Sequence, residues 1–545
     1  MSSLNGVFNI AKSALMTSQK ALNVTSHNIS NANTDGYTRQ RAVLSANNPV
    51  TFGGLQYGTG VSVTAIERVY DSFRTVQLRS AVSLFSSYET AGSHLYALES
   101  ILNDFDGSGL SSRLDALFNA FQELAANPSS YGERSSLIAR ATVLADTINS
   151  IDGAIRDNVS NIRGSIEAKV SEINGIASEI AGLNQQISAT ELSGMDANDL
   201  RDRRDVLLEG LAKVVDVSVA ENDQGQVDVF LGGSFIVAGV KSSEMTAGTD
   251  PDSIDAFKLY LNGASIESRI SSGSIKGDID GYAYFKDAHS KINLLAASLV
   301  KEVNLQHSAG WGLDGSTGVD FFTPLSVSTR SAGTNQGGAV ISAGAVTDLS
   351  QLTLDDYEIR FSGPGAYTVF NAGQNSVVAT GAYTSGSTIG FDGLSVTITD
   401  GARPPAAGDK FMVSATESAA RNFSVAVTDP DKVAASSTSA GVPGDNTNAT
   451  ELAGLRDKAS ISGASFGNFY NRVVTDLGTS AGNAKARAEA QKIYMSELRA
   501  ARDSVSGVSI EEEAINLVKL QRAYEAAAKV MSTVDQMLET LLSIR

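Results

Sequence analysis

The sequence has no cysteine among its 545 residues, so no disulfide framework can form and a zinc site would lack its usual thiolate ligands. It contains four histidines, and none of them stand at metal-ligand spacing. Lys and Arg number 42 against 60 Asp and Glu, and the resulting net charge of −18 argues against nucleic acid as a partner. No apolar run approaches the ~20 residues that span a bilayer.

The N-terminal residues also lack a basic segment followed by an apolar core, so no secretory signal is visible. This observation alone would indicate the cytoplasm. The absence of cysteine, however, also lets a chain reach an oxidising exterior without forming wrong disulfides. Hydrophobic residues make up 42% of the chain, which is typical of globular protein, and the length predicts more than one domain.

The strongest pattern in the chain lies in residues 507–545. Apolar residues recur there every 3.5 positions on average, the a/d repeat of a coiled coil, without a break over 517–541. Ser509 and Glu512 form a capping box at the start of this predicted helix, and Glu513 alone interrupts the seam. The predicted seam residues are Leu517, Leu520, Tyr524, Met531, Val534, Leu538 and Leu541.

A second 3.5-residue repeat runs through residues 4–32, with large residues at one seam position and mostly small ones at the other. A large/small seam interdigitates with another helix and permits close approach. We therefore expect the two terminal helices to pair as an assembly element. Packing of two amphipathic helices on an ordinary core is the alternative. The N-terminal seam residues are Leu4, Phe8, Leu15, Leu22 and Ile29.

Between these helices the hydrophobic period changes along the chain. Residues 70–213 predict helices, including one long run over 134–192, and helix returns over about 287–307. In residues 216–275 and 324–449, short runs of alternating apolar and polar residues stand between Gly-rich turns, which predicts strands. The expected fold is mainly α with inserted β-rich domains. Its parts are a terminal coiled-coil domain (1–45 and 505–545), a helical-bundle rod domain (46–215, 276–323 and 450–504), a β-rich subdomain (216–275) and an inserted outer β-rich domain (324–449).

Two connecting segments have no sustained period. Residues 38–69 predict an extended linker with one or two short strands, or a plain loop. Residues 434–449 predict a flexible return linker. Because helical ends enclose a β-rich middle, the chain must fold back on itself, which puts both termini at one end of a rod-shaped molecule.

Short motifs with possible chemistry carry little weight. Ser465 lies in a GxSxG string, but a triad of that type needs a histidine after the serine, and all four histidines precede it. Residues 104–115 echo an EF-hand loop without the bidentate Glu at position twelve, and 314–320 echo it more weakly. The prediction is no enzyme, no cofactor and no metal, with a secreted hydrolase as a remote alternative.

Residues 27–39, HNISNANTDGYTR, resemble the Asn-rich N-terminal signature of the bacterial flagellar rod, hook and hook-associated proteins. Residues 517–530, LVKLQRAYEAAAKV, resemble the C-terminal signature of the same axial family. Two separate motifs in the right order make this resemblance specific. The residues that carry it are Asn28, Asn31, Asn33, Gly36, Tyr37, Gln521, Arg522, Ala523, Tyr524 and Glu525.

The length and residues 281–322 point more narrowly to the hook-associated protein 1 branch of that family. The resemblance implies a structural subunit that polymerises with like subunits and joins hook to filament. It implies hook protein and hook-associated protein 3 as neighbours, and a cytosolic export chaperone on the C-terminal helix. It also implies an extracellular location, reached by type III export without a cleaved signal. A hook or rod subunit of the same family is the alternative.

Overall fold

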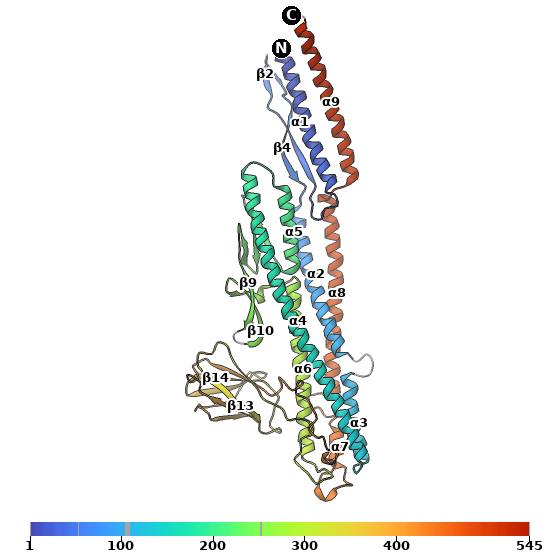
Figure 1. Ribbon diagram of the computed structural model, residues 1–545, viewed down its shortest axis with the longest axis vertical. Helices are drawn as coiled ribbons and strands as arrows, with labels where there is room; N and C mark the ends of the chain where they lie inside the picture. Colours follow the sequence, from blue (N-terminus) through green and yellow to red (C-terminus); the bar gives the residue numbers. More distant parts are fainter. Residues whose placement is uncertain (1, 53, 104–108, 251–252, 544–545) are drawn as a thin grey trace.

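The computed structural model describes residues 2–52, 54–103, 109–250 and 253–543 and has the shape of a long rod (Figure 1). Helices run along most of its length, β-rich parts attach at the side, and both termini lie at one end. The mainly α fold with β-rich insertions is confirmed. The helices are α1 (Ser2–Ser30), α2 (Ser72–Leu102), α3 (Leu110–Ala126), α4 (Tyr131–Leu192), α5 (Asn198–Val214), α6 (Ser274–Ser308), α7 (Thr447–Gly454), α8 (Phe466–Ser506) and α9 (Ile510–Ser543), with 3-10 turns at Glu267–Arg269, Pro430–Lys432 and Ser439–Gly441.

Helix α4 forms the spine of the rod and packs against α3, α5 and α6. Ser130 caps its start by accepting a hydrogen bond from the Glu133 N–H at 3.3 Å. Each of the glycines within it costs about 1 kcal/mol relative to alanine, so tertiary packing must stabilise the helix. An apolar stripe provides that packing and is fully buried at Ile148, Ile155, Ile166, Ile173, Ile180 and Ile187.

Helix α6 begins at Ser274, well before the start near residue 287 that the sequence predicts. Gly277 and Gly281 weaken a helical prediction there, but the structure explains both glycines by close packing on α2. A Cβ atom on Gly277 would lie 2.5 Å from Thr90 Cβ, and one on Gly281 would lie 2.4 Å from His94 Cδ2. Glycine lowers the helix propensity at these positions, but its lack of a Cβ atom lets α6 and α2 pack closely.

The segment over 38–69, predicted as an extended linker with one or two short strands or as a plain loop, forms a β-ribbon that packs against α1. Strand β1 (Gln40–Ala46) pairs antiparallel with β4 (Val61–Arg68), and a hairpin of β2 (Val50–Phe52) and β3 (Leu55–Tyr57) extends it. The Thr17 hydroxyl of α1 donates a hydrogen bond to the Val61 carbonyl at 2.9 Å. The ribbon covers one side of α1 and leaves another side for α9.

The remaining strands form the lateral β-rich parts. One sheet, in the order β5-β6-β7-β8, contacts α4 and contains β5 (Ser218–Glu221), β6 (Val227–Leu231), β7 (Ser234–Ala238) and β8 (Lys241–Ser242). Beside it, in the order β11-β10-β9, are β9 (Met245–Asp250), β10 (Ser253–Leu261) and β11 (Ala264–Ser265).

The inserted domain packs two antiparallel sheets around an aromatic core. One has the order β12-β19-β14-β15-β16 and contains β12 (Ser328–Ser331), β14 (Tyr357–Gly363), β15 (Ala366–Asn371), β16 (Ser376–Ala382) and β19 (Lys410–Ser414). The other has the order β13-β18-β17 and contains β13 (Val340–Val346), β17 (Thr388–Phe391) and β18 (Leu394–Thr399). The rings of Tyr357 and Phe391 join the two sheets with centroids 4.9 Å apart.

The return segment 434–449 is bound to the rod and does not form the flexible linker that its polar composition predicts. The Ala434 N–H donates to His307 Nε2 at 2.9 Å, and the Trp311 N–H donates to the Ser436 carbonyl at 2.8 Å. The fully buried Arg134 donates to the carbonyls of Pro128 and Val433. Backbone and side-chain hydrogen bonds of this kind leave no period in the sequence.

Candidate assembly interface

Helices α1 and α9 pack along each other at the end of the rod that holds both termini (Figure 1). The chain runs toward the rod in α1 and away from it in α9, so the pair is antiparallel. On α9 the most buried residues stand at multiples of seven positions, at Glu513, Ala527 and Val534. On α1 they are mainly small residues, including Ala11, Ser18, Ala21 and Thr25.

The structure brings the two predicted seams together but covers their large residues incompletely. Val534 is buried and Tyr524 is exposed, while the side chain of Leu541 lies outside the described residues. The half-buried members are Leu4, Phe8, Leu15, Leu22, Ile29, Leu517, Leu520, Met531 and Leu538. On α1 the buried positions are instead held mainly by small residues, such as Ala11 and Ala21.

Further apolar residues on the same two helices are exposed and lie outside the predicted seam. Met16 is 55% exposed on α1 and Ile515 is 57% exposed on α9. Exposed large apolar residues are typical of surfaces that bind another protein. A single heptad stripe does not include them, so the 3.5-residue repeat does not predict them. These exposed residues, called the outer face below, are Val7, Ile10, Met16, Ile515, Val518, Val530 and Met537.

The base of the helix pair is held by Asn28, a residue of the N-terminal signature that is 1% exposed. Its amide nitrogen donates to the Gln40 carbonyl at 2.8 Å and to Glu513 Oε2 at 3.2 Å. Its amide oxygen accepts from the Tyr37 hydroxyl at 2.8 Å and from the Gln40 N–H at 3.0 Å. All four hydrogen bonds that an asparagine side chain can make are therefore satisfied.

Glu513, which interrupts the predicted seam, is the acidic centre of this cluster and is 2% exposed. Its Oε1 accepts from Arg39 Nε at 2.8 Å, and Arg39 also pairs with the exposed Glu512 at 3.1 Å. A buried carboxylate with charged and neutral donors fixes the position of one helix along the other. Sequence reasoning missed this role, although the arginine and asparagine of residues 27–39 are suitable partners for an acidic residue.

Two more signature residues shape the turn that leads out of α1. Burial, followed by the nearby charges of Asp199, Asp202 and Glu513, raises the pKa of Tyr37, so its hydroxyl stays a donor. Gly36 has a φ of +76°, and a Cβ atom there would lie 2.1 Å from Val206 Cγ2.

The other signature residues take part less in the fold. Asn31 donates from its side chain to the His27 carbonyl at 3.1 Å, and Asn33 is exposed. All five residues of the C-terminal signature are exposed, so the packing of a single chain does not account for it. These residues are Gln521, Arg522, Ala523, Tyr524 and Glu525.

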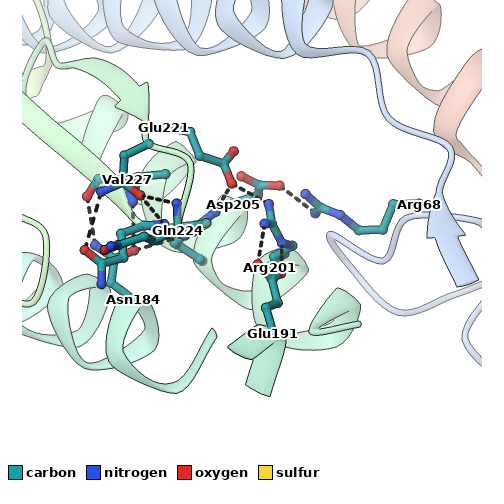
Figure 2. Close-up of polar contacts among 12 residues, drawn as sticks. Arg68, Asn184, Glu191, Arg201, Asp205, Glu221, Gln224 and Val227 are labelled. Carbon is teal, nitrogen blue, oxygen red and sulfur yellow. Dashed lines mark hydrogen bonds and ion pairs between the residues drawn. The ribbon is translucent and has the colours of Figure 1, made fainter. Parts of the chain in front are cut away.

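A row of charged residues on α5 connects this terminal part to the rod (Figure 2). Arg68 of β4 donates to Asp202 at 2.7 Å and to Asp205 at 2.8 Å. Asp202 also accepts from the Thr38 N–H at 2.9 Å, and burial raises the pKa of its carboxyl group. These contacts attach both the turn after α1 and the end of the ribbon to α5.

The next arginines on α5 continue the connection toward α4 and the first sheet. Arg201 pairs with Glu191 at 2.6 Å and with Glu221 at 2.5 Å. Arg204 donates to Asn184 Oδ1 at 3.0 Å and to the Gly225 carbonyl at 2.6 Å. Figure 2 shows these two groups of contacts, which attach α5 to the terminal part on one side and to α4 and the first sheet on the other.

The motifs with possible chemistry have structural roles or lie outside the described residues. Ser465 caps α8 by accepting from the Asn468 N–H at 3.4 Å. Asp314 accepts from the Ser316 N–H at 2.9 Å in a turn, and residues 104–108 of the EF-hand echo are not described. Within the described ranges, no group of three or more acidic or histidine side chains could hold a metal ion. The helices described here include none with the length and hydropathy of a membrane span.

Comparison with known families first defines the class. Residues 8–38 match the family described as flagella basal body rod protein, and 501–544 match the C-terminal domain described as flagellar basal body rod FlgEFG protein. The chain is thus a flagellar axial protein, and the two segments that match this class contain α1 and α9. Residues 95–322 match the flagellar hook-associated protein FlgK helical domain, and 330–415 match the D2-like domain of flagellar hook-associated protein 1.

Relatives extend these matches over the whole chain. Flagellar hook-associated protein 1 of Escherichia coli K12 is 30% identical over 558 residues, covering 99% of this chain and 100% of the relative. The Bacillus subtilis protein of the same name is 26% identical over 574 residues, covering 98% and 97%. The chain belongs to the flagellar hook-associated protein 1 family.

A solved structure gives independent support for the fold. The flagellar hook junction protein FlgK from Burkholderia pseudomallei aligns with a TM-score of 0.66 at 20% identity, covering 79% of this chain and all of that one. The family matches also define the function: the protein is a structural component of the hook–filament junction and not an enzyme. It acts outside the cell, among other flagellar proteins. The family matches favour this function over a hook or rod subunit and over a hydrolase.

Proposed function

We propose that this subunit joins hook to filament by packing its α1–α9 pair against the pairs of neighbouring copies, so that these helices form the inner layers of a tube. The observation that carries the proposal is the half-covered seam, together with the exposed apolar side chains of the outer face on both helices. Full burial of one such side chain contributes about 1.5–3 kcal/mol, so contact with a neighbour would stabilise both pairs.

We assign the four predicted domains to different places in the assembly. The terminal domain (1–45 and 505–545) would make the tube and the rod domain (46–215, 276–323 and 450–504) would support it. The β-rich subdomain (216–275) and the inserted domain (324–449) would lie outside, because both project from the side of the rod (Figure 1). The network on α5 would transmit load between tube and rod, which suits a mechanical adaptor.

The proposed neighbours are like subunits, hook protein below and hook-associated protein 3 above. Before assembly the outer face of α9 would be exposed in the cytosol, and an export chaperone would cover it there. Export would follow the type III route without a cleaved signal. The exposed C-terminal signature, which single-chain packing leaves unexplained, supports contacts of this kind.

Met531→Asp tests the proposal, because Met531 is half-buried in the free subunit and would be enclosed in the tube. A carboxylate in a dry seam costs several kcal/mol. We expect the melting temperature of the monomer to stay within a few degrees of wild type. We also expect binding of the purified variant to isolated hooks, counted by electron microscopy, to be abolished.

Glu539→Gln is the matched control, because Glu539 is exposed on the same helix and its variant should bind hooks normally. Adding purified protein to hooks separates assembly from any loss of chaperone binding and secretion. If Met531→Asp unfolds the monomer, α9 belongs to an intramolecular core. If it binds hooks as wild type does, the seam does not form the tube.

A further inference from the structure

The hairpin of β2 and β3 lies beside α1 and is exposed to solvent. Its two strands form a sheet of their own, and β1 and β4 of the ribbon that carries it form another sheet of two strands. Val50, Leu55 and Tyr57 are 58%, 62% and 52% exposed. A two-stranded hairpin is at best marginally stable in water without a covering layer. The hairpin therefore has large apolar side chains that nothing in the described chain covers.

The register of the hairpin places these three side chains on one face. Val50 pairs with Tyr57 across the two strands, so their side chains are neighbours. Leu55 stands two positions before Tyr57 on β3, and side chains two apart point to the same face of a strand. Gln56, between them, is exposed on the other face. The face formed by Val50, Leu55 and Tyr57 is called the hairpin face below.

The sequence around the hairpin is free of charge. No Asp, Glu, Lys or Arg occurs from residue 42 to residue 66, although these residue types make up 19% of the chain. Proteins commonly place charges on uncovered strands, because charges oppose contact with another chain. Their absence beside large exposed apolar side chains indicates a surface that another protein covers. Covering it would bury no charge of the hairpin itself.

Another side of the terminal part presents a helix that fits this face. The ribbon and α9 both pack on α1, and Figure 1 shows them on different sides of it, with the hairpin near the free end of the pair. In the half of α9 toward that end, Val530 and Met537 are 45% and 53% exposed. They stand about two helical turns apart, which puts both on one side of the helix. Each copy thus has an apolar strand face and an apolar helix side.

We propose that the hairpin face of one copy binds the side of α9 that carries Val530 and Met537 in the next copy. This inference rests on the proposed function and specifies which surfaces of neighbouring pairs meet. A contact between two different surfaces of like subunits continues from copy to copy, whereas two hairpins that met each other would close a dimer. A second copy is the fitting occupant, because both halves of the contact are present on different sides of one chain.

A helix suits the hairpin face better than an added strand does. The pairing of β1 with β4 is irregular between Val43 and Leu44, and Pro49 directly precedes β2. Bulges and prolines of this kind oppose the addition of another strand to an open edge. Contact through apolar side chains needs no continuous edge.

Leu55→Asp tests the contact, and Gln56→Asp is the control, because it adds the same charge on the other face of the same strand. Both residues are exposed, so each purified variant should melt within a few degrees of wild type. Binding to isolated hooks, measured by electron microscopy over a concentration series, should weaken roughly 100-fold for Leu55→Asp and stay unchanged for Gln56→Asp. Equal binding of the two variants would overturn the proposal. So would a large fall in the melting temperature of Leu55→Asp, since the hairpin face would then be packed within the chain.

Single cysteines identify the two surfaces directly, because the chain has no cysteine of its own. Leu55→Cys is mixed with Met537→Cys or with Val530→Cys on isolated hooks and treated with a mild oxidant. We expect disulfide-linked dimers from the mixtures, none from any of the three variants alone, and none when Gln56→Cys replaces Leu55→Cys. Dimers of Leu55→Cys with itself would show that hairpins meet each other and would overturn the proposal.

Two remaining outcomes separate this inference from the proposed function. If Leu55→Asp loses hook binding but neither α9 variant forms a disulfide with Leu55→Cys, the hairpin face would be assigned to hook protein, and the proposal would be overturned. If wild type itself does not bind isolated hooks, the proposed function fails, which is a different result.

Discussion

The rod and the terminal helix pair are both built from long α-helices, but they bury their apolar residues to different degrees. The stripe of α4 is completely covered by its neighbours within the chain. On the terminal pair, Phe8 and Met531 are only half-covered, and Met16 and Ile515 lie mostly in water. A helix that completes its packing within one chain stabilises the monomer, whereas one that does not is available for a partner. Under the proposed function, stability and assembly therefore depend on different parts of the molecule.

The largest effect on the monomer is expected in the rod. Phe285 of α6 is fully buried, so Phe285→Ala removes an aromatic side chain from the core and leaves a cavity. The free energy of unfolding should fall by about 3–5 kcal/mol, as measured by urea unfolding. A loss below about 1 kcal/mol would show that the rod is not the stable unit.

The next effect comes from pH and again concerns the rod. Burial, and to a lesser degree the charge of Arg134, lowers the pKa of His307 from 6.5 to about 4, against the opposing hydrogen bond to the Val319 carbonyl. The unfolded chain therefore binds this proton at a higher pH than the folded one. The stabilisation is complete above pH 6.5 and is lost as pH falls toward 4, by roughly 3 kcal/mol in all.

Unfolding of wild type and His307→Gln at several pH values isolates this contribution. The variant should show a shallower loss of stability between pH 6.5 and 4, because glutamine does not titrate. Parallel curves for the two proteins would mean that His307 is not kept neutral by its surroundings.

A smaller, local effect is expected at the base of the terminal pair. Glu513→Ala deprives Asn28 and Arg39 of their buried acceptor and should cost about 1.5–3 kcal/mol. Hydrogen exchange should quicken along α1 and α9 and stay unchanged in α4. Glu512→Ala is the control, because it removes only an exposed ion pair to the same arginine, worth about 0–1 kcal/mol. Equal exchange in the two variants would argue against the cluster.

The smallest effect on the monomer is expected for Phe8→Ala, the counterpart of Phe285→Ala in the terminal pair. Phe8 is half-buried, so the monomer should lose about 1 kcal/mol or less of unfolding free energy. Binding to isolated hooks should nevertheless weaken strongly, since the tube would enclose this ring. If both phenylalanines cost the monomer the same, the contrast between the two regions does not hold.

The helices and the β-rich insertions could be predicted because periodicity is a local property of the sequence. The cluster around Glu513 could not be predicted, because its partners Asn28 and Arg39 lie 485 and 474 positions away in the sequence. The start of α6 was missed because propensity disfavours Gly277, whereas packing against α2 requires it. Tertiary contacts decide these features, and they leave only isolated residues in the sequence.

The separation of 485 positions between Asn28 and Glu513 also has a consequence for quality control. Contacts between such distant residues form late in folding, because a long loop must close before they contribute. A chain interrupted before α9 could still fold much of its rod, but α1 would have no partner helix and Arg39 no buried acceptor. A chain that stops before α9 would therefore lack the paired helices that we propose to meet a neighbour.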